Sequence, residues 1–176
     1  MTGTDLTRSQ QVSLVLLRTL VGWHFLYEGY FKLWRPAWSR AGAPLAPWTS
    51  AGYLRAASGP LAGVFQRLGG SHWLGSIDVL VAVTLALVGI SLLLGIFTQG
   101  GCAGALLLLS MFYLSSIPTN GVHETGSEGA YLWVNKNLVE AGAVLVLLVF
   151  GTGRIAGLDH LRRGRRAGGI RSGGAS

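Results

Sequence analysis

Four stretches of apolar residues recur along the chain, separated by segments rich in glycine, proline and charge. A helix needs about 20 mostly apolar residues to cross the hydrocarbon core of a bilayer. The second and third stretches are separated only by the turn TQGG, so tight a connection that the two helices must run antiparallel. The pattern predicts four spans, over residues 12–33, 77–97, 101–117 and 131–150.

The segment between the first two spans has no apolar run long enough to cross a bilayer. Four apolar residues in its second half recur at the spacing of one helix face: Leu61, Val64, Phe65 and Leu68. We predict short amphipathic helices near residues 49–58 and 60–69, lying on the membrane surface and roofing the bundle. An irregular loop is the alternative.

Composition supports membrane insertion. Half of the 176 residues are hydrophobic, only 12% are charged, and mean hydropathy is +0.47, whereas soluble domains carry roughly 25% charged residues. This argues against a soluble enzyme, a nucleic-acid-binding domain or a disordered tail and points to an integral membrane protein. The single cysteine, Cys102, excludes an intrachain disulfide and a cysteine-based zinc site. The predicted fold class is all-α, an integral membrane four-helix bundle with short amphipathic helices in the first extracytoplasmic loop.

Positive charge gathers at the C-terminal end. The chain has a net charge of +7, and residues 154–176 hold six arginines against one aspartate. Basic residues beside a span favour the cytoplasmic side, and an even number of spans puts both termini there. We therefore expect a multi-pass protein of the inner or plasma membrane, with one membrane domain over residues 1–153 and a basic cytoplasmic tail over 154–176.

Ionisable side chains inside the spans are the candidate functional residues, because each costs about 2.5–3.5 kcal/mol to insert. The first span carries Arg18 and three residues at i, i+4 and i+8 that share a face: His24, Glu28 and Lys32. The fourth begins with aromatic Trp133 and three polar residues at helical spacing: Lys136, Asn137 and Glu140. We predict that the two sets converge in one polar site. The alternative is that these charges only pair to hold the helices together.

No histidine pair has metal-ligand spacing, so no metal site is predicted. His72 and His123 lie in loops, and their role stays open. Flavin, nicotinamide and P-loop motifs are absent. Any redox role therefore requires a lipid-soluble cofactor or a partner protein.

Three parts of the sequence resemble the DoxX family. Arg18, Gly22, Gly29 and Lys32 form an R…G…G…K pattern in the first span. Residues 52–65 (GYLRAASGPLAGVF) and 121–140 (GVHETGSEGAYLWVNKNLVE) are similar to the DoxD-type branch, the membrane subunit of thiosulfate:quinone oxidoreductase. The resemblance covers residues 12–150 and implies a four-helix membrane bundle that passes electrons from a reduced sulfur compound to quinone.

Within that resemblance, the polar residues take chemical roles. Reducing quinone needs protons, which Glu28, Glu140 and His24 are suited to supply. Substrate or quinone binding falls to the cationic, amide and aromatic groups: Arg18, Lys32, Lys136, Asn137 and Trp133. Besides the lipid bilayer, the expected partners are a soluble or membrane redox subunit and a second copy of the chain. Two alternatives remain open, a non-catalytic membrane anchor for a soluble redox enzyme and a small transporter.

Overall fold

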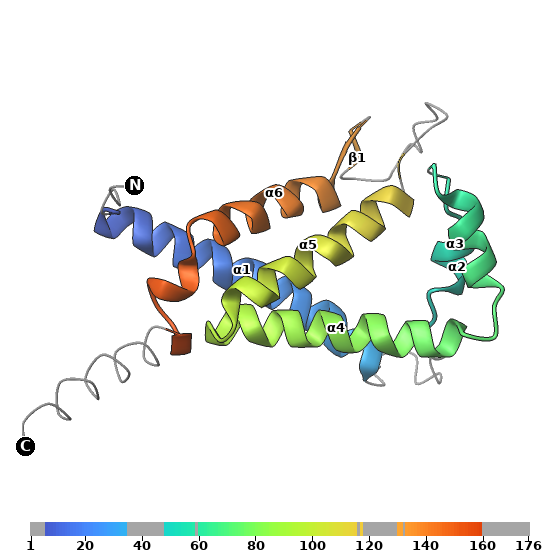
Figure 1. Cartoon of the computed structure of the whole chain (residues 1–176), viewed down its shortest axis with the longest axis horizontal. Coiled ribbons are helices and arrows are strands. Elements are labelled where there is room, and N and C mark those ends of the chain that lie inside the picture. The colour runs from blue at the N-terminus through green and yellow to red at the C-terminus, as the bar shows by residue number, and fades with distance from the viewer. Residues whose placement is uncertain are drawn as a thin grey trace, which may run out of the picture.

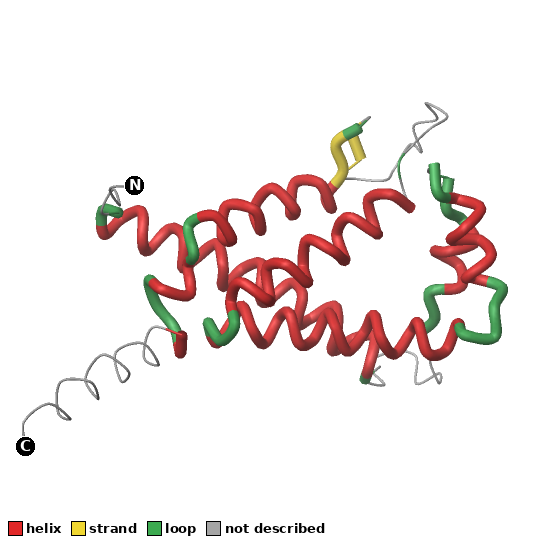
Figure 2. Tube along the Cα trace, viewed as in Figure 1, coloured by secondary structure: helices red, strands yellow, loops and turns green. Residues whose placement is uncertain are grey.

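A computed structural model describes residues 6–34, 48–58, 60–115, 117, 130–131 and 133–159, and this part of the chain is predominantly helical (Figures 1 and 2). The helices are α1 (Arg8–Leu33), α2 (Ala51–Arg55), α3 (Ala62–Gly69), α4 (Leu74–Leu94), α5 (Thr98–Ser115) and α6 (Lys136–Val149), followed by a 3-10 turn, η1 (Thr152–Arg154). A two-stranded hairpin, β1 (Ala130–Tyr131) and β2 (Val134–Asn135), precedes α6. The chain is all-α as predicted, apart from this hairpin.

Each of the four apolar stretches forms one long helix, but the predicted bounds shift. The second and third helices each begin three residues earlier than expected. The largest error is in the fourth, where the first residues of the predicted span form the hairpin. Helix α6 begins at Lys136 because Asn135 is extended (φ −116°, ψ 173°) and its side chain accepts a hydrogen bond from the Leu138 amide. Such a side-chain cap fixes a helix start.

The four long helices of the described chain pack as a ring in which each contacts two neighbours. Helix α1 packs most extensively on α4, and α5 on α6, while α4–α5 and α1–α6 contacts join the two pairs. The start of α1, the α4–α5 turn and the end of α6 lie at one end of the bundle (Figure 2). Helices α2 and α3, which we call the lid, lie at the other end.

Glycines bring α1 and α4 together along their length. A Cβ atom at Gly29 would lie 2.8 Å from the Ala86 Cα, and one at Gly89 would lie 2.6 Å from the Leu26 Cα. Gly22 is similarly close, 3.0 Å from the Leu92 Cβ. The two backbones therefore touch where side chains would otherwise separate them, as in other small-residue helix contacts.

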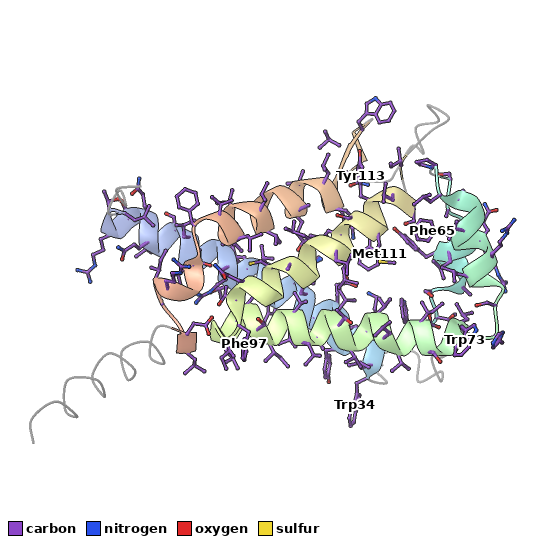
Figure 3. The ribbon with its side chains drawn as sticks, in the orientation of Figure 1. Trp34, Phe65, Trp73, Phe97, Met111 and Tyr113 are labelled. Atoms are coloured by element: carbon purple, nitrogen blue, oxygen red, sulfur yellow. The ribbon has the colours of Figure 1, made fainter. Side chains whose placement is uncertain are left out.

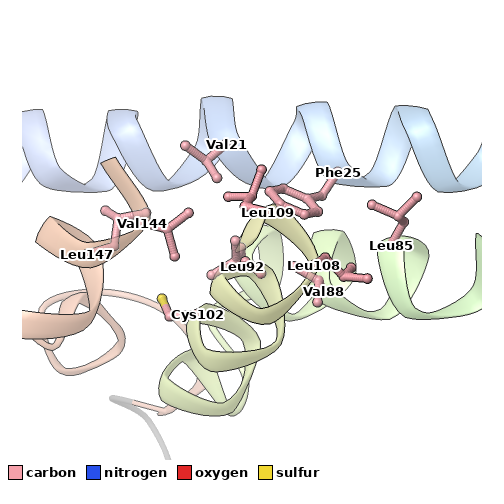
Figure 4. Packing of buried hydrophobic residues seen from close by; sticks show 11 residues of the cluster. Val21, Phe25, Leu85, Val88, Leu92, Cys102, Leu108, Leu109, Val144 and Leu147 are labelled. Carbon is pink, nitrogen blue, oxygen red and sulfur yellow. The ribbon is translucent and has the colours of Figure 1, made fainter. Parts of the chain in front are cut away.

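An apolar core fills the middle of the bundle. Val21 and Phe25 point from α1 toward the side chains of the other helices (Figure 4). The remaining fully buried members come from α4, α5 and α6: Leu85, Val88, Leu92, Cys102, Ala105, Leu108, Leu109, Val144 and Leu147. A second, smaller cluster holds the lid together, with Phe65 of α3 buried against Leu54 of α2. Leu61 and Val64 remain exposed, so only part of the predicted apolar face of α3 is buried.

One described helix, Leu74–Leu94, is long and apolar enough to cross a membrane by itself. The other three long helices differ from it in composition or length. Helix α1 carries several ionisable residues, and α6 has 14 residues.

The glycine contact gives a test of the α1–α4 packing. Gly89→Ala should lower the free energy of unfolding by about 1–3 kcal/mol, because the new methyl group overlaps the α1 backbone. The matched control is Gly142→Ala on α6, where a Cβ would meet no atom within 4 Å. Thermal unfolding in detergent, followed by circular dichroism, compares the two. Equal melting temperatures would contradict the close contact.

Candidate functional site

A cavity of about 310 Å³ lies between the α1–α4 pair and the α5–α6 pair, beneath the lid. Two parts of its lining differ in chemical character, and the rest comes from Phe25 of α1, Ser115 of α5 and the lid end: Trp48, Thr49, Ser50, Tyr53, Leu54, Phe65 and Leu68. One, the polar edge, consists of His24, Glu28, Lys32, Lys136, Asn137 and Glu140. The other, the apolar wall, consists of Ile77, Val81, Leu85, Leu108, Leu109, Met111 and Phe112.

All six residues of the polar edge are ones that the sequence singled out. Three come from α1 at i, i+4 and i+8, and three from the first turns of α6. The structure brings the two sets together because α1 and α6 are neighbours in the ring. Their chemical roles stay predictions.

On the α1 side of the polar edge, Lys32 is firmly held. Its Nζ donates a hydrogen bond to the carboxylate of Glu28 one turn earlier. The same atom lies 5.2 Å from the ring centroid of Trp48, a cation–π contact. The Lys32 side chain is only 16% exposed, whereas that of Glu28 is 40% exposed. Lys32 is thus committed to protein partners, and Glu28 keeps an accessible carboxylate.

A histidine–carboxylate pair joins α1 to α6. His24 Nε2 lies 3.6 Å from Glu140 Oε2. The Glu140 side chain is 17% exposed and the His24 side chain 49% exposed, so the pair reaches from the interior of the cavity to the protein surface. An imidazole beside a carboxylate is a pairing that can pass protons to and from a ligand.

Lys136 and Asn137 are the uncommitted groups of the polar edge. Neither side chain makes a hydrogen bond or ion pair with another residue in the described part of the chain. Both line the cavity, Lys136 exposed and Asn137 half-buried. The charge of Lys136 interacts with those of Glu140 and Glu28 at longer range, and both the ammonium and the amide are suited to donate hydrogen bonds to an oxygen-bearing ligand.

The lid brings residues to the cavity that sequence reasoning missed. Tyr53 of α2 donates a hydrogen bond to the Phe112 carbonyl (2.9 Å) and accepts one from Ser115 Oγ (2.7 Å). At the other side of the lid, the amide and hydroxyl of Ser50 both donate to Asp78 at the start of α4. In the sequence, Asp78 is recognisable as a charge at the start of an apolar span. Its partner Ser50 could not be predicted, because it lies 28 residues away in the chain.

Arg18 lies away from the cavity, at the opposite end of the bundle. Its guanidinium Nη1 donates to the carbonyls of Thr152 (3.0 Å) and Ala156 (2.7 Å), and the residue is buried. This geometry does not support the predicted role in quinone binding. Arg18 instead fixes the chain after α6, because a buried guanidinium must find acceptors.

Trp133 also lies outside the cavity lining. It occupies the turn of the β1–β2 hairpin, is 60% exposed, and its carbonyl accepts a hydrogen bond from the Tyr113 hydroxyl (2.9 Å). Its predicted role in ligand binding stays a prediction. Trp48, which lies against Lys32, is the tryptophan among the cavity-lining residues of the described chain.

Residues 154–159, which the sequence assigned to the tail, contact the helices of the bundle. Asp159 accepts hydrogen bonds from the Phe97 amide, the Thr98 amide and the Thr98 hydroxyl, each at 3.0 Å. Its own amide donates to Gly95. Residues up to 159 therefore belong to the bundle. The remaining tail, 160–176, and His123 lie outside the described residues.

His72 is exposed in the turn before α4, with its ring 4.8 Å from that of Trp73, and it does not line the cavity. Across the described part of the chain, no three His, Cys, Asp or Glu side chains gather as a metal site.

Fold and cavity together define an all-α bundle with an internal site that is polar along one edge and apolar along the other. No protein-family model, curated protein or solved structure matches this chain.

The position of Arg18 predicts a structural rather than a ligand-binding effect. Arg18→Met should lower the free energy of unfolding by about 1–3 kcal/mol, because two carbonyls lose their buried donor. Binding at the cavity, per folded molecule, should stay unchanged. Melting temperature and ligand titration measure the two effects, with exposed Arg67→Gln as the control. Weakened binding without loss of stability would instead show that Arg18 takes part in ligand binding.

Proposed function

We propose that the chain is a multi-pass membrane protein in which all four long helices cross the bilayer. The support is apolar surface on the outside of every one of them: Leu20 of α1, Leu87 of α4, Leu107 of α5 and Val149 of α6 are all exposed. Many further large apolar side chains are exposed on the same helices. Soluble monomers rarely expose apolar surface so widely, and lipid would cover it.

Hydroxyl groups on the helices fit the same proposal. Thr19 donates to the Val15 carbonyl (2.9 Å), and Thr84 donates to the Leu80 carbonyl (2.7 Å). A hydroxyl that bonds to its own helix needs no water. Because water is absent from the hydrocarbon core, polar groups there must find such internal partners.

Helix α6 is the shortest of the proposed spans. Its 14 residues give a length of about 21 Å, against about 30 Å for the hydrocarbon core. We propose that its polar first turn lies below the membrane surface, where the cavity shelters Lys136 and Asn137 from lipid.

The topology is tested by cysteine labelling in intact cells. With both termini in the cytoplasm, Thr125→Cys in the outer loop should react with a membrane-impermeant maleimide, and Ile170→Cys in the tail should not. Native Cys102 is buried and serves as the unlabelled background. Labelling of position 170 from outside would reverse the orientation.

For the cavity, we propose that it binds the head group of a membrane quinone and that the chain is the membrane subunit of a quinone-linked oxidoreductase. The observation that carries this is the division of the cavity into a polar edge and an apolar wall. A quinone has the matching chemistry, with carbonyl oxygens on a flat apolar ring. Cavities that bind small ligands commonly combine an apolar lining with a few convergent polar groups in this way.

When bound, a quinone would supply the redox chemistry, since it accepts two electrons and two protons. Lys136 and Asn137 would donate hydrogen bonds to its oxygens. The His24–Glu140 pair would hold a proton at the cavity and take up another through the exposed face of the imidazole. Glu28, whose partner Lys32 is fixed against Trp48, would keep a negative charge beside this pair.

The proposed electron donor is a reduced sulfur compound such as thiosulfate, on the basis of the resemblance to the DoxD-type subunit. The chain offers no recognised cofactor-binding motif of its own for carrying electrons. We therefore propose that they arrive through a partner subunit or directly from the anionic donor.

Substitution at the uncommitted lysine tests the quinone proposal. Lys136→Met should leave the melting temperature unchanged and weaken quinone binding about tenfold, because it removes a charged hydrogen-bond donor worth roughly 1.5–3 kcal/mol. Quenching of the protein's tryptophan fluorescence, to which Trp48 at the cavity contributes, reports binding. Exposed Arg67→Gln, on the lid and outside the cavity lining, is the control.

The wild-type protein provides an independent measurement. Solvent extraction of protein purified from membranes should release a stoichiometric quinone. If the extract contains none and added quinone quenches no fluorescence, the cavity serves another ligand or only holds the helices together.

A further inference from the structure

The polar edge and the apolar wall lie on opposite sides of the bundle. Every residue of the polar edge comes from α1 or α6, and every residue of the apolar wall comes from α4 or α5. Because α1 and α6 are neighbours in the ring, as are α4 and α5, the polar edge lies on the α1–α6 side of the cavity and the apolar wall on the α4–α5 side.

Apolar residues that are not fully covered line the α4–α5 side. Met111 is 43% exposed although it lines the cavity, and Figure 3 places it on α5 near the lid. Opposite it on α4, Ile77 and Val81 are half-buried. The cavity therefore reaches the outer surface here through apolar side chains, with a flexible methionine at the opening.

The end of the cavity beneath the lid is closed by hydrogen bonds. Ser50 holds the start of the lid to Asp78 of α4. Tyr53 holds α2 to α5 through the Phe112 carbonyl, and the Ser58 amide donates to the Ser115 carbonyl (3.2 Å). A long chain attached to a ligand in the cavity would have to break these bonds to leave through the lid.

The size of the cavity limits what it can hold. At about 310 Å³, it is at the small end of the roughly 300–1,000 Å³ typical of ligand cavities. It accommodates a head group with a short length of chain, so the rest of a long tail must lie outside the protein.

We propose that the ligand is an amphiphile with a single long tail, held with its head against the polar edge and its tail leaving between α4 and α5, past Met111, into the bilayer. The inference rests on the proposed function and adds the orientation of the ligand and the path of its tail. It also accounts for the two sides of the cavity. In this proposal the head lies on the α1–α6 side, which polar groups line, and the tail leaves on the α4–α5 side, which apolar groups line.

A tryptophan at the apolar opening tests the path of the tail. Met111→Trp should weaken binding of menaquinone about tenfold or more, and that of tail-less menadione less than about twofold. Leu107→Trp is the matched control, on the same helix, 65% exposed and outside the cavity lining. Retained menadione binding shows in the same assay that the variant is folded.

Photolabelling of the wild-type protein gives a second measurement that needs no variant. Menaquinone carrying a diazirine at the far end of its tail should label α4 and α5 near Met111, or the lipid beside them, and excess untagged menaquinone should abolish the protein label. Label on α1, α6 or the lid, or equal weakening of both quinones by Met111→Trp, would overturn the tail path while leaving the quinone site standing. Failure of the wild-type protein to bind either quinone would instead reject the proposed function.

Discussion

Backbone contact between α1 and α4 is the constraint on which the site depends. Gly29 and Gly89 admit no side chain between the helices, so the rotation of α1 about its axis is fixed. Glu28 precedes Gly29 by one residue and therefore lies about 100° around the helix. With the glycine face turned to α4, the face that carries His24 and Glu28 is turned toward α6. One steric contact thus directs the polar residues of α1 into the cavity.

The cavity exists because the helices pack unevenly. Contacts within the α1–α4 and α5–α6 pairs are more extensive than those between the pairs, and the space between the pairs widens beneath the lid. Unpaired charges there would cost several kcal/mol each. Glu28 with Lys32, and His24 with Glu140, offset that cost. Lys136 and Asn137 make no ion pair or hydrogen bond of this kind among the described residues, which is why the proposed function assigns them to a ligand.

The two ends of the bundle are built for different purposes. At the α4–α5 turn, Arg18 and Asp159 bind backbone groups of segments distant in sequence and hold residues 152–159 in place. At the lid end, Asp78 and Tyr53 hold two short helices over a space rather than filling it. One end therefore closes the fold, and the other shapes a site. An aspartate serves at each end, Asp159 at one and Asp78 at the other, so residue type alone does not distinguish the two roles.

The sequence by itself determined the helices and the residues of the polar edge. Apolar stretches and the spacing of His24, Glu28 and Lys32 are local properties, set by helix periodicity. Only the tertiary structure decided the positions of Arg18 and Trp133, because their surroundings come from segments distant in sequence. It also decided the hairpin before α6 and the apolar wall opposite the polar edge. An apolar residue looks the same in the sequence whether it faces the core, the cavity or the surroundings of the protein. Only the packing of the helices therefore distinguishes the residues of the apolar wall from the others.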